Sequence, residues 1–306
     1  MLMAFPGAGK STLVKEYTDQ GFFKISRDDY GGGLSELNDV IDRNIKMGKE
    51  KIILDNTYMT QDSRREAIQL AKKNGFWITG IHLNTSIEDS MYNAVSRMIG
   101  RHGKLFMTPD DYKKSKDPNM FPIAALYKAK KAFEKPSTAE GFDEIKTVNF
   151  KRLSKGYTNK AVILDYDGTL RKTKSGELFP TDPSDIEILP GRTARLKEYI
   201  AKGYILLGVS NQSGVAKGQL SYETAVKCFE KTNELLGLDI DVKFCPHSVP
   251  PITCYCRKPG VGFGVEFVEK YKLNPADCIM VGDMTSDATF AKRSGFKYVP
   301  ADQFFK

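Results

Sequence analysis

The chain has few cysteines, few histidines and no long apolar run. Its 306 residues include five cysteines and three histidines, and no apolar stretch approaches the roughly 20 residues that cross a bilayer. Three cysteines lie close together at Cys245, Cys254 and Cys256, which argues against a disulfide framework and for a reducing compartment. The first residues lack a charged segment followed by a cleavage site, so nothing indicates secretion. We therefore expect a cytoplasmic protein with no membrane partner.

Length and charge limit the class of protein further. A chain of 306 residues is long for one hydrophobic core, so two domains are expected. The formal net charge is +8, and lysines concentrate between residues 104 and 135 and between 146 and 160. This distribution is consistent with a polyanionic partner, although a moderately basic surface is also common in soluble proteins.

The most informative stretch is AVILDYDGTL, residues 161–170. Its continuous apolar run predicts a strand buried on both faces, as in parallel α/β sheets, with Asp165 and Asp167 at the carboxyl end where such sheets place their chemistry. One aspartate could attack a phosphorus atom while the other protonates the leaving oxygen and shares a metal ion. The alternative is a strand followed by an ordinary Asp-Gly turn.

A glycine-rich loop follows a very short apolar run at the start of the chain. In PGAGKST, residues 6–12, glycines let the backbone wrap a phosphate, Lys10 would bridge the outer phosphates, and Ser11 would place its hydroxyl on Mg²⁺. The usual pattern has glycine where this chain has Ala4, and the run is short enough to leave open a start further upstream. A plain glycine-rich turn is the alternative. We expect a nucleotide-binding loop formed by Gly7, Gly9, Lys10, Ser11 and Thr12.

Other polar residues of the first half follow expected strands and helices. Asp28, in RDDY, suits a general base for an attacking hydroxyl, although Asp28 or Asp29 would serve equally as a helix cap. Asp55 ends the buried strand KIILD and would face the same crevice. Arg97 and Arg101 are spaced to share one helix face and would close over a transferring phosphate, with a solvated basic helix end as the alternative.

Strand and helix patterns alternate along the chain, which predicts an α/β protein with parallel sheets. The polar, basic segment after residue 150 marks a domain boundary. We therefore predict a first domain over residues 1–150, a linker over 151–159 and a second domain over 160–306. Residues 171–190 carry glycine and prolines and read mostly as loop. This leaves no room for a large cap, so a site beside Asp165 should be open to bulky substrates.

The clustered cysteines predict a metal site. Three thiolates and an imidazole, from Cys245, His247, Cys254 and Cys256, form the set that tetrahedral structural Zn²⁺ takes, and the C-x-H and C-x-C spacings let each pair chelate from one turn. A disulfide or chance core cysteines would leave His247 unexplained. A four-ligand site is closed, so this zinc would shape a loop and would not take part in chemistry.

The second half resembles the haloacid-dehalogenase superfamily through four segments in order: DYDGTL, ILLGVSN, CRKPG and IMVGDMTSD. The resemblance implies a Rossmann-like domain with a minimal cap, in which Asp165 is the nucleophile and Asp167 the general acid and base. It further implies that Asp165, Asp167 and Asp283 hold Mg²⁺ with support from Asp287, that Lys258 is catalytic, and that Ser210, Asn211 and Arg257 bind substrate. The zinc loop before Arg257 and the run NQSGVAKG after Ser210 look like the histidinol-phosphatase and heptose-bisphosphate-phosphatase branch.

The first half resembles the kinase domain of the phage polynucleotide kinase/phosphatase family, over roughly residues 1–150, through GAGKST, RDDY, DNT and the arginine pair. The resemblance implies a P-loop domain in which Lys10 and Ser11 bind ATP and Asp28 is the general base for a 5′-hydroxyl. It also implies that Asp55 holds the acceptor end and that Arg97 and Arg101 belong to a lid. The family has an arginine directly after RDDY where this chain has Gly31, which puts one acceptor contact in doubt.

The leading hypothesis is a bifunctional end-healing enzyme, an ATP-dependent 5′-hydroxyl kinase joined to a Mg²⁺-dependent 3′-phosphatase that act on RNA or DNA ends. A phage origin would place it in the cytoplasm of a host cell. A kinase and phosphatase of small molecules, such as a sugar or histidinol-phosphate-like substrate, is the second hypothesis. A non-catalytic nucleic-acid-binding module is the third. The sequence leaves open RNA against DNA and whether a homo-oligomer forms.

Overall fold

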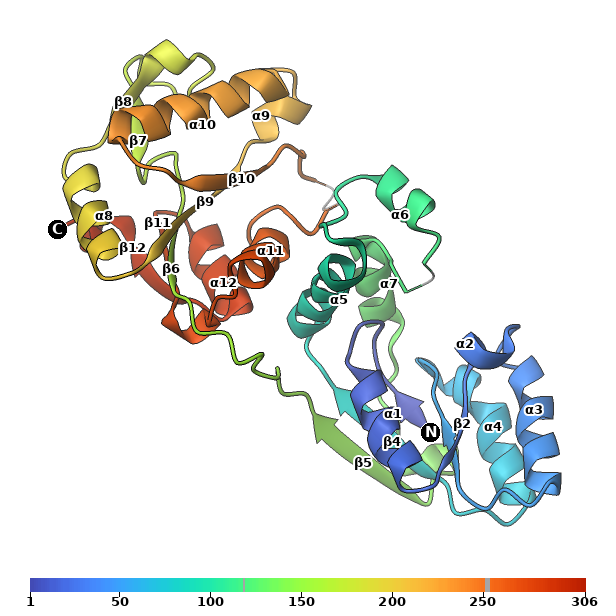
Figure 1. Ribbon diagram of the computed structural model, residues 1–306. Coiled ribbons are helices and arrows are strands. Elements are labelled where there is room, and N and C mark those ends of the chain that lie inside the picture. Colours follow the sequence, from blue (N-terminus) through green and yellow to red (C-terminus); the bar gives the residue numbers. More distant parts are fainter. Residues whose placement is uncertain (118, 251–253) are drawn as a thin grey trace. The chain divides into compact units, whose positions relative to one another are not determined.

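The computed structural model describes residues 1–117, 119–250 and 254–306. The chain packs as two compact units, one of residues 1–93 and 124–153 and the other of residues 94–123 and 154–306. Residues 94–123 therefore pack with the second unit, whereas the sequence motifs predict that they belong to the first domain. The predicted domain limits therefore stay a prediction, and each unit is described by itself (Figure 1).

The first unit contains two small parallel sheets. In one, β4 (Thr79–Asn84) lies between β1 (Leu2–Met3) and β5 (Glu144–Asn149), and in the other β2 (Phe23–Ile25) pairs with β3 (Ile52–Leu54). The backbone amide of Ala4, just after β1, donates to the carbonyl of Thr57, just after β3, at 3.2 Å. The ends of both sheets are therefore tied together where the polar motifs begin.

Helices connect these strands in the alternation that the sequence predicts. They are α1 (Lys10–Asp19), α2 (Arg27–Tyr30), α3 (Glu36–Lys46), α4 (Gln61–Lys73), α5 (Ile87–His102), α7 (Ile123–Ala132) and the 3-10 turn η1 (Thr138–Glu140). The helix α4 begins with a capping box, because Thr60 and Ser63 each satisfy the other's backbone amide. The apolar faces of α3 and α4 pack on the strands around Ile25, Ile41 and Leu54.

The second unit is built on a five-stranded, fully parallel sheet. Its order is β10 (Asp241–Cys245), β9 (Ile205–Asn211), β6 (Ala161–Leu164), β11 (Ile279–Gly282) and β12 (Lys297–Pro300). All four residues of the central β6 have no exposed surface, as expected for a strand covered on both faces. This confirms the α/β class with parallel sheets.

The second unit contains further helices and turns besides the strands of this sheet. They are α6 (Pro109–Ser115), α8 (Arg192–Ala201), α9 (Ser213–Ala216), α10 (Tyr222–Leu236), α11 (Gly262–Tyr271), α12 (Thr285–Ser294), α13 (Ala301–Phe304) and the 3-10 turns η2 (Pro183–Asp185) and η3 (Pro275–Asp277). Residues 171–190, which we read mostly as loop, include an antiparallel hairpin of β7 (Arg171–Thr173) and β8 (Ile186–Ile188). The hairpin packs beside α10 (Figure 1) and is the small cap that this position allows.

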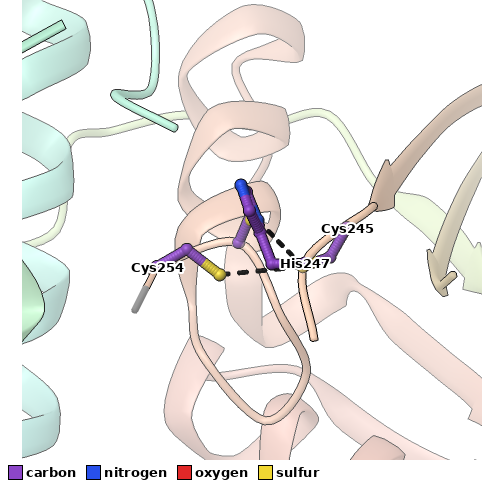
Figure 2. A group of neighbouring side chains, drawn as sticks. Cys245, His247 and Cys254 are labelled. Carbon is purple, nitrogen blue, oxygen red and sulfur yellow. Dashed lines mark hydrogen bonds between the residues drawn. The ribbon is translucent and has the colours of Figure 1, made fainter. Parts of the chain in front are cut away.

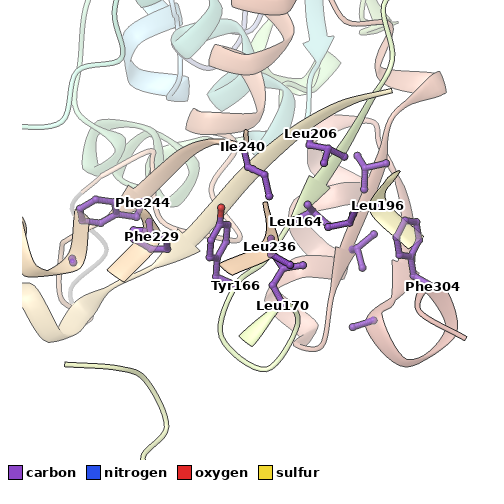
Figure 3. Close-up of a cluster of buried hydrophobic side chains, with 14 of the residues drawn as sticks. Leu164, Tyr166, Leu170, Leu196, Leu206, Phe229, Leu236, Ile240, Phe244 and Phe304 are labelled. Carbon is purple, nitrogen blue, oxygen red and sulfur yellow. The ribbon is translucent and has the colours of Figure 1, made fainter. Parts of the chain in front are cut away.

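The core of the second unit lies directly behind the Asp165 strand end. Tyr166 is fully buried, its ring meets Phe229 edge to face at 4.9 Å, and its hydroxyl donates to Asn233 at 2.7 Å (Figure 3). Tyr166 lies between the two aspartates of the DYD segment and packs into the core. Its packing therefore fixes the backbone around both aspartates. None of the described helices is long and apolar enough to cross a membrane.

Candidate functional site

The carboxyl end of β6 brings a buried lysine against the predicted nucleophile. The Nζ of Lys258 lies 2.5 Å from Asp165 Oδ1 and 2.7 Å from Asp287 Oδ1, and it donates to the carbonyl of Val209 at 2.9 Å. Lys258 is 4% exposed, Asp165 7% and Asp287 fully buried. One ammonium thus serves two buried carboxylates, which is the arrangement that makes burial of all three charges tolerable.

Burial dominates the electrostatics of this pair. It raises the pKa of Asp165 to about 7, with the charge of Lys258 opposing the rise and that of Asp287 adding to it. The two carboxylates raise the pKa of Lys258 although burial acts to lower it. The lysine therefore stays charged, and it holds the oxygen of Asp165 in a fixed direction.

The predicted general acid, Asp167, is held from two sides. Its Oδ1 accepts from Arg171 Nε at 2.8 Å, and its Oδ2 accepts from Gln212 Nε2 at 2.7 Å. The same Gln212 nitrogen donates to Ser210 Oγ at 3.0 Å. The structure therefore joins the predicted phosphate-binding serine to the predicted proton donor through one side chain.

The side chain of Asn211 bonds the backbone of Lys258, and its predicted substrate contact stays a prediction. Its Nδ2 donates to the carbonyl of Lys258 at 3.0 Å, and its Oδ1 accepts from the amide of Lys258 at 2.9 Å. Both polar groups of the amide are thus used to place the Lys258 backbone. Arg257, which precedes it, donates through NH1 to the carbonyl of His247 at 3.3 Å.

Three carboxylates could hold a cation beside the nucleophile. Asp165, Asp283 and Asp287 have oxygen atoms within 4.8 Å of one another, and hard oxygen ligands are those that Mg²⁺ prefers. Two glycines make this grouping possible, because a Cβ on Gly168 would lie 2.4 Å from Asp283 Oδ2 and one on Gly282 would lie 2.3 Å from Asp287 Oδ2. The residues fit a divalent cation.

The predicted share of Asp167 in that cation site is a separate matter. Both of its carboxylate oxygens already accept the hydrogen bonds from Arg171 and Gln212, and the cluster contains Asp287 in its place. The role of Asp167 as a ligand stays a prediction.

The four predicted zinc ligands lie together, and Figure 2 shows three of them, Cys245, His247 and Cys254. The Sγ of Cys245 is 3.6 Å from that of Cys254 and 3.4 Å from Nδ1 of His247, and the Sγ of Cys256 is 3.3 Å from the same nitrogen. Ligands at the usual Zn–S and Zn–N distances of a tetrahedron lie about 3.5–3.8 Å apart. The donor set and its spacing therefore fit a four-coordinate zinc ion.

In the first unit, the loop before α1 has the turns that the glycine pattern predicts. Gly7 and Gly9 have φ angles of 76° and 92°, values that L side chains rarely adopt. The loop is held by Thr85 Oγ1 and Asn93 Nδ2, which donate to the carbonyls of Ala8 and Gly7 at 2.9 Å each. Ala4 is not among the non-glycine residues with positive φ in the described chain, so its methyl group does not strain the turn. Ser11 and Thr12, in the first turn of α1, are exposed.

The structure separates the two neighbouring acids of RDDY. Asp29 belongs to the cap of α2, because its Oδ2 accepts from Ser26 Oγ at 2.7 Å and pairs with Lys24 at 3.0 Å. Asp28 is exposed and makes none of the side-chain hydrogen bonds or ion pairs found among the described residues. Asp28 is therefore the acid that is available for proton transfer.

Asp55 shares an electrostatic environment with these residues. Burial raises its pKa, the charges of Lys10 and Lys24 oppose the rise, and those of Asp28 and Asp29 add to it. Two other predicted site residues, Lys10 and Asp28, therefore lie close enough to influence Asp55. Arg97 and Arg101 lie on the part of α5 that belongs to the second unit, and Arg101 pairs there with Asp117 at 2.9 Å. Their role as a lid stays a prediction.

Two residues of the second site escape sequence reasoning. Gln212 lies in the run NQSGVAKG without an assigned role, and Arg171 has only its spacing of four from Asp167 as a signal, which fits a turn that brings the two residues together. A backbone bridge between Asp167 and Arg171 shows that turn in the structure.

A parallel α/β sheet with an aspartate pair, a buried lysine and a further acidic pair at its carboxyl edge defines an aspartate-based phosphatase. Residues 160–305 match the family model described as Polynucleotide kinase 3 phosphatase. A probable D-glycero-D-manno-heptose-1,7-bisphosphate 7-phosphatase of Thermoplasma acidophilum is 30% identical over 159 residues, which are 50% of this chain and 97% of the relative. The chain belongs, through its second half, to the haloacid-dehalogenase family of phosphatases.

This chain is also similar to the following proteins. The D-glycero-beta-D-manno-heptose-1,7-bisphosphate 7-phosphatase of Haemophilus ducreyi is 34% identical over 148 residues, 45% of this chain and 80% of the relative. A chain in a solved structure described as the Pnkp1/Rnl/Hen1 complex is 16% identical and aligns over 98% of this chain and 94% of that chain, with a TM-score of 0.33.

Proposed function

We propose that the chain is a bifunctional end-healing enzyme that removes 3′-phosphates from polynucleotide ends and phosphorylates their 5′-hydroxyls with ATP. The observation that carries the proposal is the Asp165–Lys258–Asp287 arrangement with Asp167 beside it, in a segment that matches a polynucleotide 3′-phosphatase family model. We assign the phosphatase to residues 160–306 and the kinase to residues 1–150, joined by residues 151–159.

The phosphatase chemistry follows from the positions of the side chains. A carboxylate oxygen of Asp165 attacks the phosphorus, the bond from phosphorus to the 3′ oxygen breaks, and Asp167 gives that oxygen a proton. Water then attacks the aspartyl-phosphate, Asp167 takes the water's proton, and inorganic phosphate leaves. Lys258 holds Asp165 in line for attack, and Ser210 binds the phosphoryl group, with Asn211 and Arg257 shaping that pocket.

Mg²⁺, held by Asp165 and Asp283 with support from Asp287, would neutralise charge on the phosphoryl oxygens. Zn²⁺ on Cys245, His247, Cys254 and Cys256 would be structural, because four protein ligands leave no open position. The small β7–β8 hairpin supports a polymeric substrate, since a short cap leaves space around the site for a chain end.

The kinase proposal rests on residues of the first predicted domain, 1–150. The loop with Gly7 and Gly9 in left-handed conformations would cradle ATP phosphates with Lys10, Ser11 and Thr12. Asp28, which takes no part in the cap formed by Asp29, would accept the proton of the 5′-hydroxyl. Asp55 would hold the acceptor, and Arg97 and Arg101 would cover the transferring phosphate.

A second candidate is a phosphatase of a sugar or another small molecule, paired with a kinase of similar range. Its support is specific, because the curated relatives that cover the second half are described as heptose-bisphosphate phosphatases and the zinc ligands fit the same reading.

One experiment separates the two candidates. Purified protein with Mg²⁺ is given RNA and DNA oligonucleotides carrying a 5′-hydroxyl and a 3′-phosphate, with labelled ATP, beside a panel of sugar phosphates including a heptose bisphosphate. We expect label at the 5′ end and phosphate release from the 3′ end, each far faster than turnover of any sugar phosphate. Turnover confined to the sugar phosphates would reject the proposal.

A further inference from the structure

A buried arginine stands behind the proton donor of the phosphatase site. Arg171 is 1% exposed, and its Nε donates to Asp167 Oδ1 at 2.8 Å. The turn between them closes through Leu170 and Arg171, whose amides donate to the carbonyl of Tyr166 at 2.9 and 3.1 Å. The chain therefore returns Arg171 to Asp167 by its local geometry.

The guanidinium is fixed from its other side by α10. Its NH1 donates to the carbonyl of Cys228 at 2.7 Å and to Thr232 Oγ1 at 2.8 Å. The rings of Tyr166 and Phe229 flank it, with centroids 5.4 and 4.8 Å from its central carbon. An arginine with so many fixed contacts cannot follow a moving carboxylate, so it sets the position of that carboxylate.

The opposite oxygen of Asp167 has its own donor, Gln212, at 2.7 Å. Both oxygens are therefore directed by groups outside the reacting pair. A proton is transferred efficiently only when donor and acceptor atoms lie within about 2.6–3.2 Å, so an aspartate free to rotate would spend part of its time out of reach. A buried ion pair is a poor source of stability compared with apolar packing, which favours a role in positioning.

We infer that Arg171 is a positioning residue that fixes the Asp167 carboxylate for proton transfer to the leaving oxygen. The inference rests on the proposed phosphatase mechanism, because it assigns Asp167 the proton. Among the described residues Arg171 bonds Asp167, Cys228 and Thr232 and not Asp165, so we expect it to act through Asp167. Its effect should then depend on how strongly the leaving group needs a proton.

The test compares two leaving groups through kcat/KM, which reports the steps up to departure of the leaving group. The substrates are an oligonucleotide with a 3′-phosphate, whose alkoxide leaves poorly, and p-nitrophenyl phosphate, whose phenolate leaves without a proton. With Arg171→Gln we expect kcat/KM to fall about 10- to 100-fold on the oligonucleotide and less than about 3-fold on the aryl phosphate. Arg171→Lys should recover part of the loss on the oligonucleotide.

A double-mutant cycle with Asp167→Asn tests whether Arg171 acts through Asp167. In that background Arg171→Gln should cause no further loss on the oligonucleotide. Thr232→Val removes one hydrogen bond to the guanidinium but keeps the charge of Arg171. We expect kcat/KM on the oligonucleotide to fall about 2- to 5-fold, with little change on the aryl phosphate. Arg195→Gln is the matched control, because Arg195 bonds Glu198 and the carbonyl of Phe304 away from this site.

Equal losses on both substrates, or losses that add in the Asp167→Asn background, would overturn the inference. If Arg171→Gln does not fold, Arg171→Lys and Thr232→Val decide the question in the same way, since in each kcat/KM must fall on the oligonucleotide more than on the aryl phosphate. Wild-type protein inactive on the oligonucleotide would instead refute the proposed function. The comparison then uses whichever sugar phosphate it hydrolyses, and the expected selectivity against the aryl substrate is the same.

Discussion

Replacing Lys258 by methionine should uncover how strongly the second unit depends on one buried charge. The ammonium lies 2.5 Å from Asp165 and 2.7 Å from Asp287, and all three side chains are at most 10% exposed. Methionine fills a similar volume but leaves two buried carboxylates without their cation. Removing one partner of a buried ion pair costs about 3–5 kcal/mol.

The control is an exposed ion pair of the same unit. Lys270 lies 2.7 Å from Asp241, with side chains 51% and 29% exposed, and such pairs contribute about 0–1 kcal/mol. With a urea m-value of about 1–3 kcal/mol/M, the Lys258→Met midpoint should fall by about 1–5 M, whereas that of Lys270→Met should hardly move.

Urea unfolding of the full chain in the presence of chelator measures this difference. The single tryptophan, Trp77, lies in the first unit, so its fluorescence follows that unit while circular dichroism follows both. Mg²⁺ added without chelator should stabilise Lys258→Met more than wild type, because the ion would neutralise the carboxylates left unpaired. A cost for Lys258→Met no larger than that for Lys270→Met would refute this account of the site.

Three other outcomes are expected. Purified protein should contain about one Zn²⁺ per chain, and Cys256→Ser should abolish it by metal analysis and lower the melting temperature of the second unit while ATP binding persists. Gly168→Ala should abolish Mg²⁺-dependent phosphatase activity, since its Cβ would lie 2.4 Å from Asp283 Oδ2, and metal titration by calorimetry should show the lost affinity. Partial burial acts to raise the pKa of Asp117, but the amide of Asn119 and the hydrogen bond and charge of Arg101 outweigh it and lower the pKa to about 2. The stability that the ionised carboxylate contributes is therefore present above about pH 4 and lost as pH falls towards 2. In thermal melts, Asp117→Asn should be less stable than wild type at pH 7 and equal to it near pH 2.

The sequence predicts the position of the phosphatase site because local signals determine it. Four apolar residues before Asp165 require a covered strand, and β6 is that strand, with the acids at its carboxyl edge. The cluster of Cys245, His247, Cys254 and Cys256 is likewise predicted from spacing, since the C-x-H and C-x-C pairs need only one turn each. Both signals are short in sequence and depend on few long-range contacts.

Long-range contacts account for what the sequence does not reveal. Arg171 acquires its place from Cys228 and Thr232, 57 and 61 residues away, and no pattern near Arg171 encodes those partners. The choice between Asp28 and Asp29 depends on Ser26, whose hydroxyl takes one of two adjacent acids. The sequence predicts mostly loop where the β7–β8 hairpin lies, because each strand has only three residues. Three residues are too few to show the alternation of apolar and polar side chains that marks a strand.

Paired variants on one oligonucleotide with a 5′-hydroxyl and a 3′-phosphate show whether the chain carries two independent chemistries. Lys10→Ala removes the charge assigned to the transferring phosphate, and Asp165→Asn keeps the side-chain volume but removes the nucleophile. Lys10→Ala should lose 5′ labelling and keep 3′-phosphate release, and Asp165→Asn should do the reverse, each loss spanning several orders of magnitude. Loss of both activities in either well-folded variant would contradict the account.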